Sequence, residues 1–91
     1  MKPAVLHPAA AAEVEETYRW YESRRDGLGD EYLSVFERAL EVIRAHPDSA
    51  PVVHGDVRRQ LLRRFPQGLF YRLVERQVVV VACWLVPQAR P

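Results

Sequence analysis

The sequence predicts an α+β fold of order β-α-α-β-β-β, in which a helical hairpin packs on a small antiparallel-rich sheet. Two stretches of the first half, residues 8–25 and 30–46, repeat apolar side chains at steps of three and four residues, the spacing of amphipathic helices. The second half holds three β-prone runs separated by turn-forming residues. Because 91 residues have room for one core only, we expect a single domain over residues 1–91.

Composition favours a folded protein without disulfides or membrane spans. Apolar residues make up 48% of the chain and charged residues 27%, a balance that excludes a disordered or fibrous protein. Cys83 is the only cysteine, so disulfide and zinc frameworks are excluded and no metal or other cofactor is expected. The apolar run 78–86 is far shorter than the roughly 20 residues that span a bilayer, and the N-terminus lacks a signal pattern, so we expect a cytoplasmic location.

A brief strand and a helix are predicted at the N-terminus. The apolar residues 4–7 lie between two prolines, the second of which suits the first turn of a helix. The apolar stripe of this helix consists of Ala10, Val14, Thr17, Tyr18 and Tyr21. The helix is expected to run to about Arg25, and its pairs Glu15 with Arg19 and Glu22 with Arg25 are spaced to meet on the solvent side, each adding about 0.3 kcal/mol.

A glycine-containing linker leads into the second helix. Gly27 and Gly29 tolerate positive φ, which suits the end of the first helix, and Asp30 and Glu31 favour the positive end of the next. The apolar face of the second helix is predicted to consist of Tyr32, Phe36, Ala39 and Ile43, widened by Leu33 and Leu40. Pro47 stops this pattern, so a helical hairpin results.

A loop and three strands are predicted to follow. Residues 47–55 contain two prolines and a glycine, and we expect them to lack a regular hydrogen-bonding partner. The strands of the predicted antiparallel meander are Val57–Phe65, Leu69–Glu75 and Val78–Val86, with turns at Pro66-Gln67-Gly68 and near Arg76. Because the last run is apolar throughout, we expect it inside the sheet, beneath the helices and with both faces covered.

Charge is unevenly distributed along a nearly neutral chain. The formal net charge is +1, yet arginines cluster in the second half, with six between Arg58 and Arg76. Acidic residues gather in the first half, from Glu13 to Glu41. The asymmetry indicates an anionic partner for the second half, although an arginine-rich genome would give the same bias.

The element order and six short motifs point to a known family. The motifs are Trp20-Tyr21-Glu22, Gly27-Leu28-Gly29, Pro47 after the second helix, Val57-Arg58-Arg59, Arg64-Phe65-Pro66 and Phe70-Tyr71-Arg72. Over nearly the whole chain they resemble the RelE/ParE toxins of type II toxin–antitoxin systems, which are linked to plasmid stabilisation. The resemblance implies an inhibitor of bacterial growth, silenced by a cognate antitoxin whose extended tail wraps the toxin.

This family divides into RelE-like members, which cut messenger RNA in the ribosome, and ParE-like members, which poison DNA gyrase without cutting anything. Nuclease members commonly carry a basic residue where the third strand begins and His, Tyr, Lys or Arg after the last strand. Here those places hold Gly68 and residues 84–89, which lack the groups for charge stabilisation and proton transfer. His7, His46 and His54 lie in separate segments and are not expected to converge.

Arginines and one tryptophan are the candidates for antitoxin or target binding. They are Trp20, Arg58, Arg59, Arg63, Arg64, Arg72 and Arg90. Guanidinium groups suit phosphates and carboxylates alike, while pairing with helix glutamates is the structural alternative. Strand alternation would place neighbouring arginines on opposite faces. Trp20 packs on the second helix or contacts an antitoxin, whereas Phe70, Tyr71 and Trp84 are expected in the sheet core.

The missing basic groups favour a ParE-like toxin that is not itself an enzyme, and the resemblance to that family implies an antitoxin and DNA gyrase as its partners. One alternative is a RelE-like mRNA endoribonuclease that acts with the ribosome, for which Arg58, Arg64 and Arg72 are the catalytic candidates. Another is an inactive member that only binds an antitoxin or acts as a co-repressor. The exposed faces of the helical hairpin could also pair with a second copy of the chain, so a homodimer is a further alternative. No membrane partner is expected.

Overall fold

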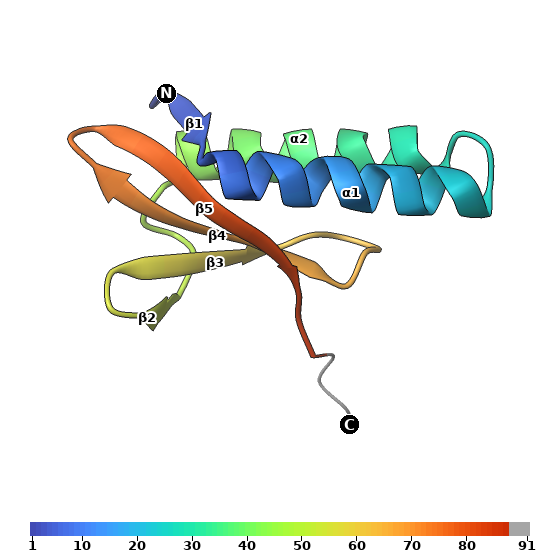
Figure 1. The fold of residues 1–91 in the computed structure, drawn as a ribbon. Coiled ribbons are helices and arrows are strands. Elements are labelled where there is room, and N and C mark those ends of the chain that lie inside the picture. The colour runs from blue at the N-terminus through green and yellow to red at the C-terminus, as the bar shows by residue number, and fades with distance from the viewer. Residues whose placement is uncertain (88–91) are drawn as a thin grey trace.

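The structure, a computed structural model that describes residues 1–87, has two layers (Figure 1). Helices α1 (Pro8–Arg24) and α2 (Leu28–Ala45) lie side by side on one face of a five-stranded sheet. The strands are β1 (Ala4–Leu6), β2 (Val52–His54), β3 (Val57–Leu61), β4 (Gln67–Val74) and β5 (Gln77–Leu85). Their order in the sheet is β1-β5-β4-β3-β2, with β1 parallel to β5 and every other pair antiparallel. The α+β class, the helical hairpin and the meander are confirmed.

Strand β2 corrects the expectation that residues 47–55 lack a regular partner. Val52 pairs with Arg58 and His54 with Val57, so β2 forms an edge strand on β3. The link between them is a two-residue turn in which Gly55 takes a φ of 57°. Two β-branched residues before such a turn are a hairpin signal, which Pro47 and Pro51 ahead of the segment obscure.

The boundary between β3 and β4 also differs from the prediction. Strand β3 ends at Leu61, four residues earlier than expected, and Gln67 and Gly68 already belong to β4. Within the following turn Arg64 adopts a φ of 70°, in the left-handed region, and the next side chain, Phe65, lies in the core. Arg63 and Arg64 therefore lie in a turn and do not alternate along a strand.

Glu22 joins the two helices in a way that its sequence spacing does not indicate. Its carboxylate accepts the backbone N–H groups of Gly27 and Gly29, each at 2.9 Å, and so caps the start of α2. The predicted pair of Glu22 with Arg25 is wrong, because Arg25 pairs instead with Glu31 at 3.2 Å. Gly27 takes a φ of 87°, whereas Gly29 lies within α2.

The predicted pair of Glu15 and Arg19 forms on the exposed side of α1. Both side chains are more than half exposed, with relative accessibilities of 60% and 74%. An ion pair of this kind adds little to stability because water screens it.

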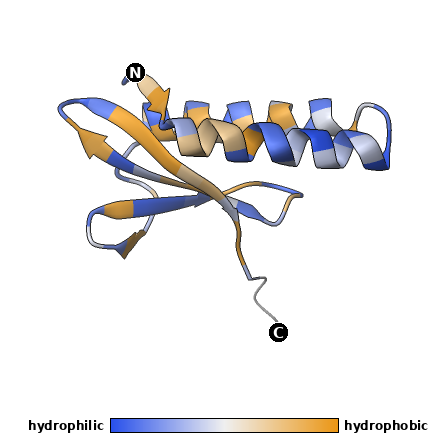
Figure 2. Ribbon diagram, viewed as in Figure 1, coloured by the Kyte–Doolittle hydropathy of each residue, from blue (hydrophilic) through white to orange (hydrophobic). Residues whose placement is uncertain are grey.

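The core fills the space between the helices and the central strands. On α2 it takes in the predicted face of Tyr32, Phe36, Ala39 and Ile43. On the sheet the fully buried side chains are Leu69, Tyr71, Val78 and Val80. Figure 2 shows the corresponding hydrophobic stretch along β5, beneath the helices.

Only one face of β5 is covered, contrary to the prediction for this apolar run. Val78 and Val80 are completely buried, whereas Val79 and Val81 are partly exposed. The helices lie on one side of the sheet only, so the alternating residues of β5 meet two different environments (Figure 1). The strand does lie inside the sheet, between β1 and β4, as expected.

The aromatic residues of β4 and β5 do not share one environment. Tyr71 is completely buried, as predicted, but Phe70 is partly exposed and Trp84 is 56% exposed. The β4–β5 register shifts between Phe70 and Tyr71, and the rings of Phe70 and Trp84 meet on the uncovered face with centroids 5.4 Å apart. Trp84 is therefore not a core residue.

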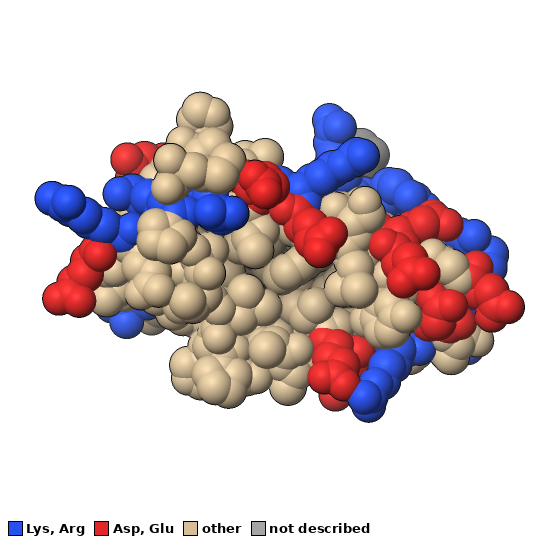
Figure 3. Space-filling model, turned by 90° about the horizontal axis from the view of Figure 1, so that it is seen from above, with Lys and Arg blue, Asp and Glu red and all other residues tan. Residues whose placement is uncertain are grey.

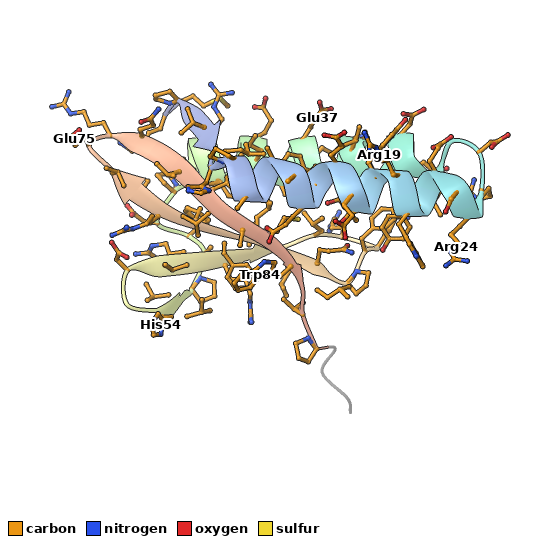
Figure 4. All side chains as sticks on the ribbon, in the orientation of Figure 1. Arg19, Arg24, Glu37, His54, Glu75 and Trp84 are labelled. Atoms are coloured by element: carbon orange, nitrogen blue, oxygen red, sulfur yellow. The ribbon has the colours of Figure 1, made fainter. Side chains whose placement is uncertain are left out.

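Glu13 closes part of the free edge of β5. Strand β1 pairs only with residues 78–80 of β5, so the last part of β5 has no neighbour on that side within residues 1–87. The carboxylate of Glu13 accepts the backbone N–H of Cys83 at 2.9 Å and also the indole N–H of Trp84, which lies beneath α1 (Figure 4). A covered edge of this kind is less open to pairing with other chains.

Replacing Tyr71 with Phe is expected to lower the free energy of unfolding by about 1–2 kcal/mol. The buried Tyr71 hydroxyl donates to the carbonyl oxygen of Pro47 at 2.7 Å, so its removal leaves that oxygen unpaired. Urea unfolding at neutral pH measures the change. Tyr21→Phe is the matched control, because within residues 1–87 the hydroxyl of Tyr21 takes part only in a long contact of 3.4 Å with Gln67. Equal effects of both variants would contradict this account.

Among residues 1–87, no helix is both long enough and apolar enough to cross a lipid bilayer.

Candidate partner-binding groove

A groove of about 540 Å³ runs between α2 and β3. Its walls combine apolar side chains with three guanidinium groups. The lining residues are Val35, Arg38, Ala39, Val42, Gln60, Leu61, Arg63 and Arg64. We call this feature the arginine groove. An apolar surface edged by cations suits a segment that is itself amphipathic and acidic.

Helix α2 supplies one wall because its apolar surface is wider than the sheet can cover. The buried stripe contains Phe36, Ala39 and Ile43, and a second stripe lies one residue earlier, with Val35 and Val42. Val42 is 45% exposed although it belongs to a helix that packs on the core. The second stripe is therefore left for another surface to cover.

Strand β3 supplies the other wall, and part of its edge is open. Strand β2 pairs with Val57 and Arg58 only, so Gln60 and Leu61 have no neighbouring strand on that side among the described residues. Leu61 is 50% exposed, and the amide of Gln60 donates to the Leu61 carbonyl oxygen at 3.3 Å. An open edge can accept an added strand from a partner chain.

The guanidinium groups of the arginine groove differ in their surroundings. Arg64 pairs with Glu31 at 2.8 Å, and Glu31 also pairs with Arg25. Arg38 and Arg63 have no ion-pair partner among residues 1–87. Arg38 and Arg63 are thus the cations of the groove that a partner carboxylate meets without competition from residues 1–87.

The ion pairs of Glu31 make the stability of the fold depend on acidity. Hydrogen bonds from Arg64 and then Arg25 lower the pKa of Glu31 below its ordinary value. A carboxyl group whose pKa is lower in the folded chain stabilises the fold at every pH above its pKa in the unfolded chain, which is about 4.3 for glutamate. That stabilisation is lost as the pH falls through the pKa of the group in the folded chain.

Glu31→Gln is therefore expected to lower stability at pH 7 and to flatten the loss of stability over the acidic interval that begins at about pH 4.5. Urea unfolding of both proteins over that interval checks the result. Added salt should shrink the difference, because the side chain of Glu31 is 38% exposed and its pairs are screened. Identical pH profiles for the two proteins would show that the ion pairs contribute nothing.

Of the binding residues predicted from sequence, the arginine groove contains Arg63 and Arg64. Arg58 faces the helical layer, where its Nη1 donates to the carbonyl oxygens of Asp48 at 3.1 Å and Ala50 at 2.6 Å. This contact holds the loop before β2 in place. Arg58 therefore has a structural role in the free chain.

The remaining predicted residues lie elsewhere. Arg72 pairs with Asp56 at 2.8 Å, which lowers the pKa of that carboxyl group. Arg59 lies on the uncovered face of the sheet, opposite Phe70 in the neighbouring strand, and its Nε is buried without a hydrogen-bond partner among the described residues. Trp20 is 52% exposed on α1. Arg90 falls outside the residues that the structure describes.

The three catalytic candidates are not brought together. Arg58 and Arg72 lie on opposite faces of the sheet, and Arg64 lies in the turn beyond β3, each held by a different partner. The histidines also lie in separate elements. His7 caps the start of α1, His46 follows the end of α2, and His54 ends the edge strand β2 (Figure 4). No group of three or more potential metal ligands occurs among residues 1–87.

Gly68 occupies a crowded position in β4. A Cβ atom there would lie 3.1 Å from Cγ of Arg59 and 3.2 Å from Cγ1 of Val86. These distances are shorter than ordinary van der Waals contacts, so a basic side chain would displace its neighbours. The absence of a basic residue at this place is consistent with the packing around it.

Sequence reasoning missed Arg38 and the apolar wall of the groove, including Val42 and Leu61. Val35, Arg38 and Val42 are spaced by three and four residues, like the core stripe. This spacing was the one sequence pattern that could have indicated a second face of the helix. Charge clustering alone did not find the groove. Figure 3, seen from the helical side, shows acidic and basic side chains interspersed and no single charged field.

Comparisons with known proteins bear on the fold. No protein-family model and no curated protein sequence matches the chain. A solved structure described as the chromosomal ParDE TA system from P. aeruginosa contains a chain that matches with a TM-score of 0.69 and 17% sequence identity. The match covers 96% of this chain and 98% of that chain. The protein therefore has the α+β fold found in that ParDE structure.

Proposed function

We propose that the chain is the toxin component of a type II toxin–antitoxin pair and that the arginine groove receives the antitoxin. The observation that carries the proposal is that one groove combines exposed apolar side chains with guanidinium groups that have no ion-pair partner among residues 1–87. Val42 and Leu61 are 45% and 50% exposed, and Arg38 and Arg63 lie beside them. The fold shared with a chain of a ParDE TA system supports the same assignment.

The groove fits an antitoxin segment with two properties. Its apolar residues would cover the second stripe of α2 and Leu61, since exposed apolar surface of this kind is stabilised by burial. Its carboxylates would meet Arg38 and Arg63, which offer bidentate hydrogen bonds. The open edge of β3 beside Gln60 adds backbone groups that an extended segment can pair with.

A non-nucleolytic, ParE-like toxin is the more specific proposal, with DNA gyrase as its target. The separation of Arg58, Arg64 and Arg72 favours it over a ribosome-dependent ribonuclease, because RNA cleavage requires an acid, a base and charge stabilisation at one site. The gyrase target rests on the family resemblance of the sequence motifs.

Induced expression in a bacterial host, without the antitoxin, tests the proposal. Growth, message integrity and plasmid supercoiling are followed together. We expect arrested growth with intact messages and altered supercoiling, and recovery when the protein of the adjacent reading frame is expressed as well. Cleaved messages would support the ribonuclease alternative instead. Normal growth would contradict the proposal that the chain is a toxin active in this host.

A further inference from the structure

A second cleft lies on the opposite side of the turn that carries Arg63 and Arg64. It has a volume of about 320 Å³ and lies between the second half of α1, the start of β4 and the end of β5. Its lining residues are Glu16, Thr17, Trp20, Tyr21, Pro66, Gln67 and Leu85. We call it the tryptophan cleft. The proposed function makes no use of it.

Large apolar side chains at the mouth of this cleft are exposed. Trp20 is 52% exposed and Leu85 is 72% exposed, whereas Gln67, at the floor, is only 5% exposed. Single exposed apolar residues need no explanation, but two of them converge here on one hollow. Tyr21 and Phe65, whose ring centroids are 4.8 Å apart, hold the turn against α1 and so keep the hollow in shape.

The charge of the cleft is opposite to that of the arginine groove. Glu16 is the only charged residue in its lining, and it is exposed and has no ion pair among residues 1–87. The Trp20 ring already interacts with a cation, because the guanidinium carbon of Arg24 lies 4.3 Å from the ring centroid at the end of α1 (Figure 4). An arginine or lysine side chain matches these surroundings, with its aliphatic stem on Trp20 and Leu85 and its charge at Glu16.

We propose that the tryptophan cleft is a second protein-binding site, which takes a basic side chain from an apolar segment of a partner protein. The arginine groove selects acidic segments and the cleft selects basic ones, so one molecule can hold two different partners. The turn of residues 62–66 separates the two sites. Because this inference depends only on the cleft, it stands or falls independently of the toxin assignment.

The test is a titration of the isotope-labelled full chain followed by NMR. The probe is the blocked tripeptide acetyl-Leu-Arg-Leu-amide, and the matched peptide carries Glu in place of Arg. We expect the arginine peptide to shift the indole N–H signal of Trp20 and the side-chain amide signals of Gln67, and the glutamate peptide to leave them unchanged.

Three variants sharpen the test. Glu16→Gln should weaken binding about two- to fivefold, and Trp20→Ala about tenfold. Glu37→Gln is the control, because it makes the same change of charge on an exposed residue of α2 outside the cleft (Figure 4). Both Glu16 and Trp20 are exposed, so the fold should tolerate their replacement.

Several results would overturn the proposal. These are no shift with the arginine peptide, equal shifts with the glutamate peptide, or equal loss of affinity in Glu16→Gln and Glu37→Gln. If Arg90→Ala alone shifts the Trp20 signal of the free chain, the occupant is the chain's own terminus and the proposal of a partner is wrong.

Discussion

Phe65→Ala is expected to lower the free energy of unfolding by about 3–5 kcal/mol. Phe65 is buried, and its ring meets Tyr21 edge-on at 4.8 Å and Tyr32 at 5.5 Å. Truncation removes these contacts and leaves a cavity between the helices and the turn before β4. A domain of this size has a total stability of only about 5–15 kcal/mol, so the loss is a large share of it.

Denaturant unfolding of Phe65→Ala beside Phe70→Ala measures this effect. Phe70 is the matched control because the same atoms are removed from a ring that is partly exposed on the uncovered face of the sheet. We expect less than about half the loss at Phe70, since less apolar area leaves water there. A smaller loss at Phe65 than at Phe70 would show that the turn is not anchored as described.

Gly29→Ala is expected to destabilise the fold by about 1–3 kcal/mol, although alanine is the better helix former. A Cβ atom at Gly29 would lie 2.8 Å from the carbonyl oxygen and from two ring carbons of Tyr18. The ring can rotate, but the carbonyl belongs to α1, so the two helices must separate. That strain outweighs the gain of about 1 kcal/mol from helix propensity.

Ser34→Ala provides the control for helix propensity. Ser34 is exposed in the same helix, so its replacement should raise stability by a few tenths of a kcal/mol. Thermal unfolding of the two variants gives shifts of opposite sign if close packing decides the effect at Gly29. Stabilisation by Gly29→Ala would mean that the helices are not in the close contact described.

Much of the fold was predictable because it depends on local patterns. The helix bounds follow from the periodicity of α1 and α2 and from Pro47, and the helix-facing side of β4 and β5 follows from their apolar residues. β2 was missed because all three of its residues are exposed, so no alternation marks it. The turn after β3 contains Arg64 in the left-handed conformation, which no residue pattern indicates.

The candidate site was only half predictable, because it depends on contacts between distant segments. Arg63 and Arg64 were found by charge, but Arg38 joins them only because α2 packs beside β3. Arg58 and Arg72 are arginines like those of the groove, but in the folded chain they bind partners within the chain. Arg58 donates to backbone carbonyl oxygens, and Arg72 pairs with Asp56. Residue type therefore found Arg63 and Arg64 but not Arg38, and only the fold shows which arginines have an ion-pair partner among residues 1–87.

Binding of the antitoxin in the arginine groove can be tested directly by one measurement. The double variant Arg38→Glu, Arg63→Glu reverses the two groove charges that have no ion-pair partner in the described part of the chain. The double variant Arg19→Glu, Arg76→Glu makes the same change of charge at exposed positions outside it. Calorimetry with the protein of the adjacent reading frame compares both with the unaltered chain. We expect the groove variant to bind this protein at least about a hundredfold more weakly than the unaltered chain does. The affinity of the control variant should stay within a few-fold of that of the unaltered chain. Equal affinities of the two variants, or no binding by the unaltered chain, would contradict an antitoxin site in the arginine groove.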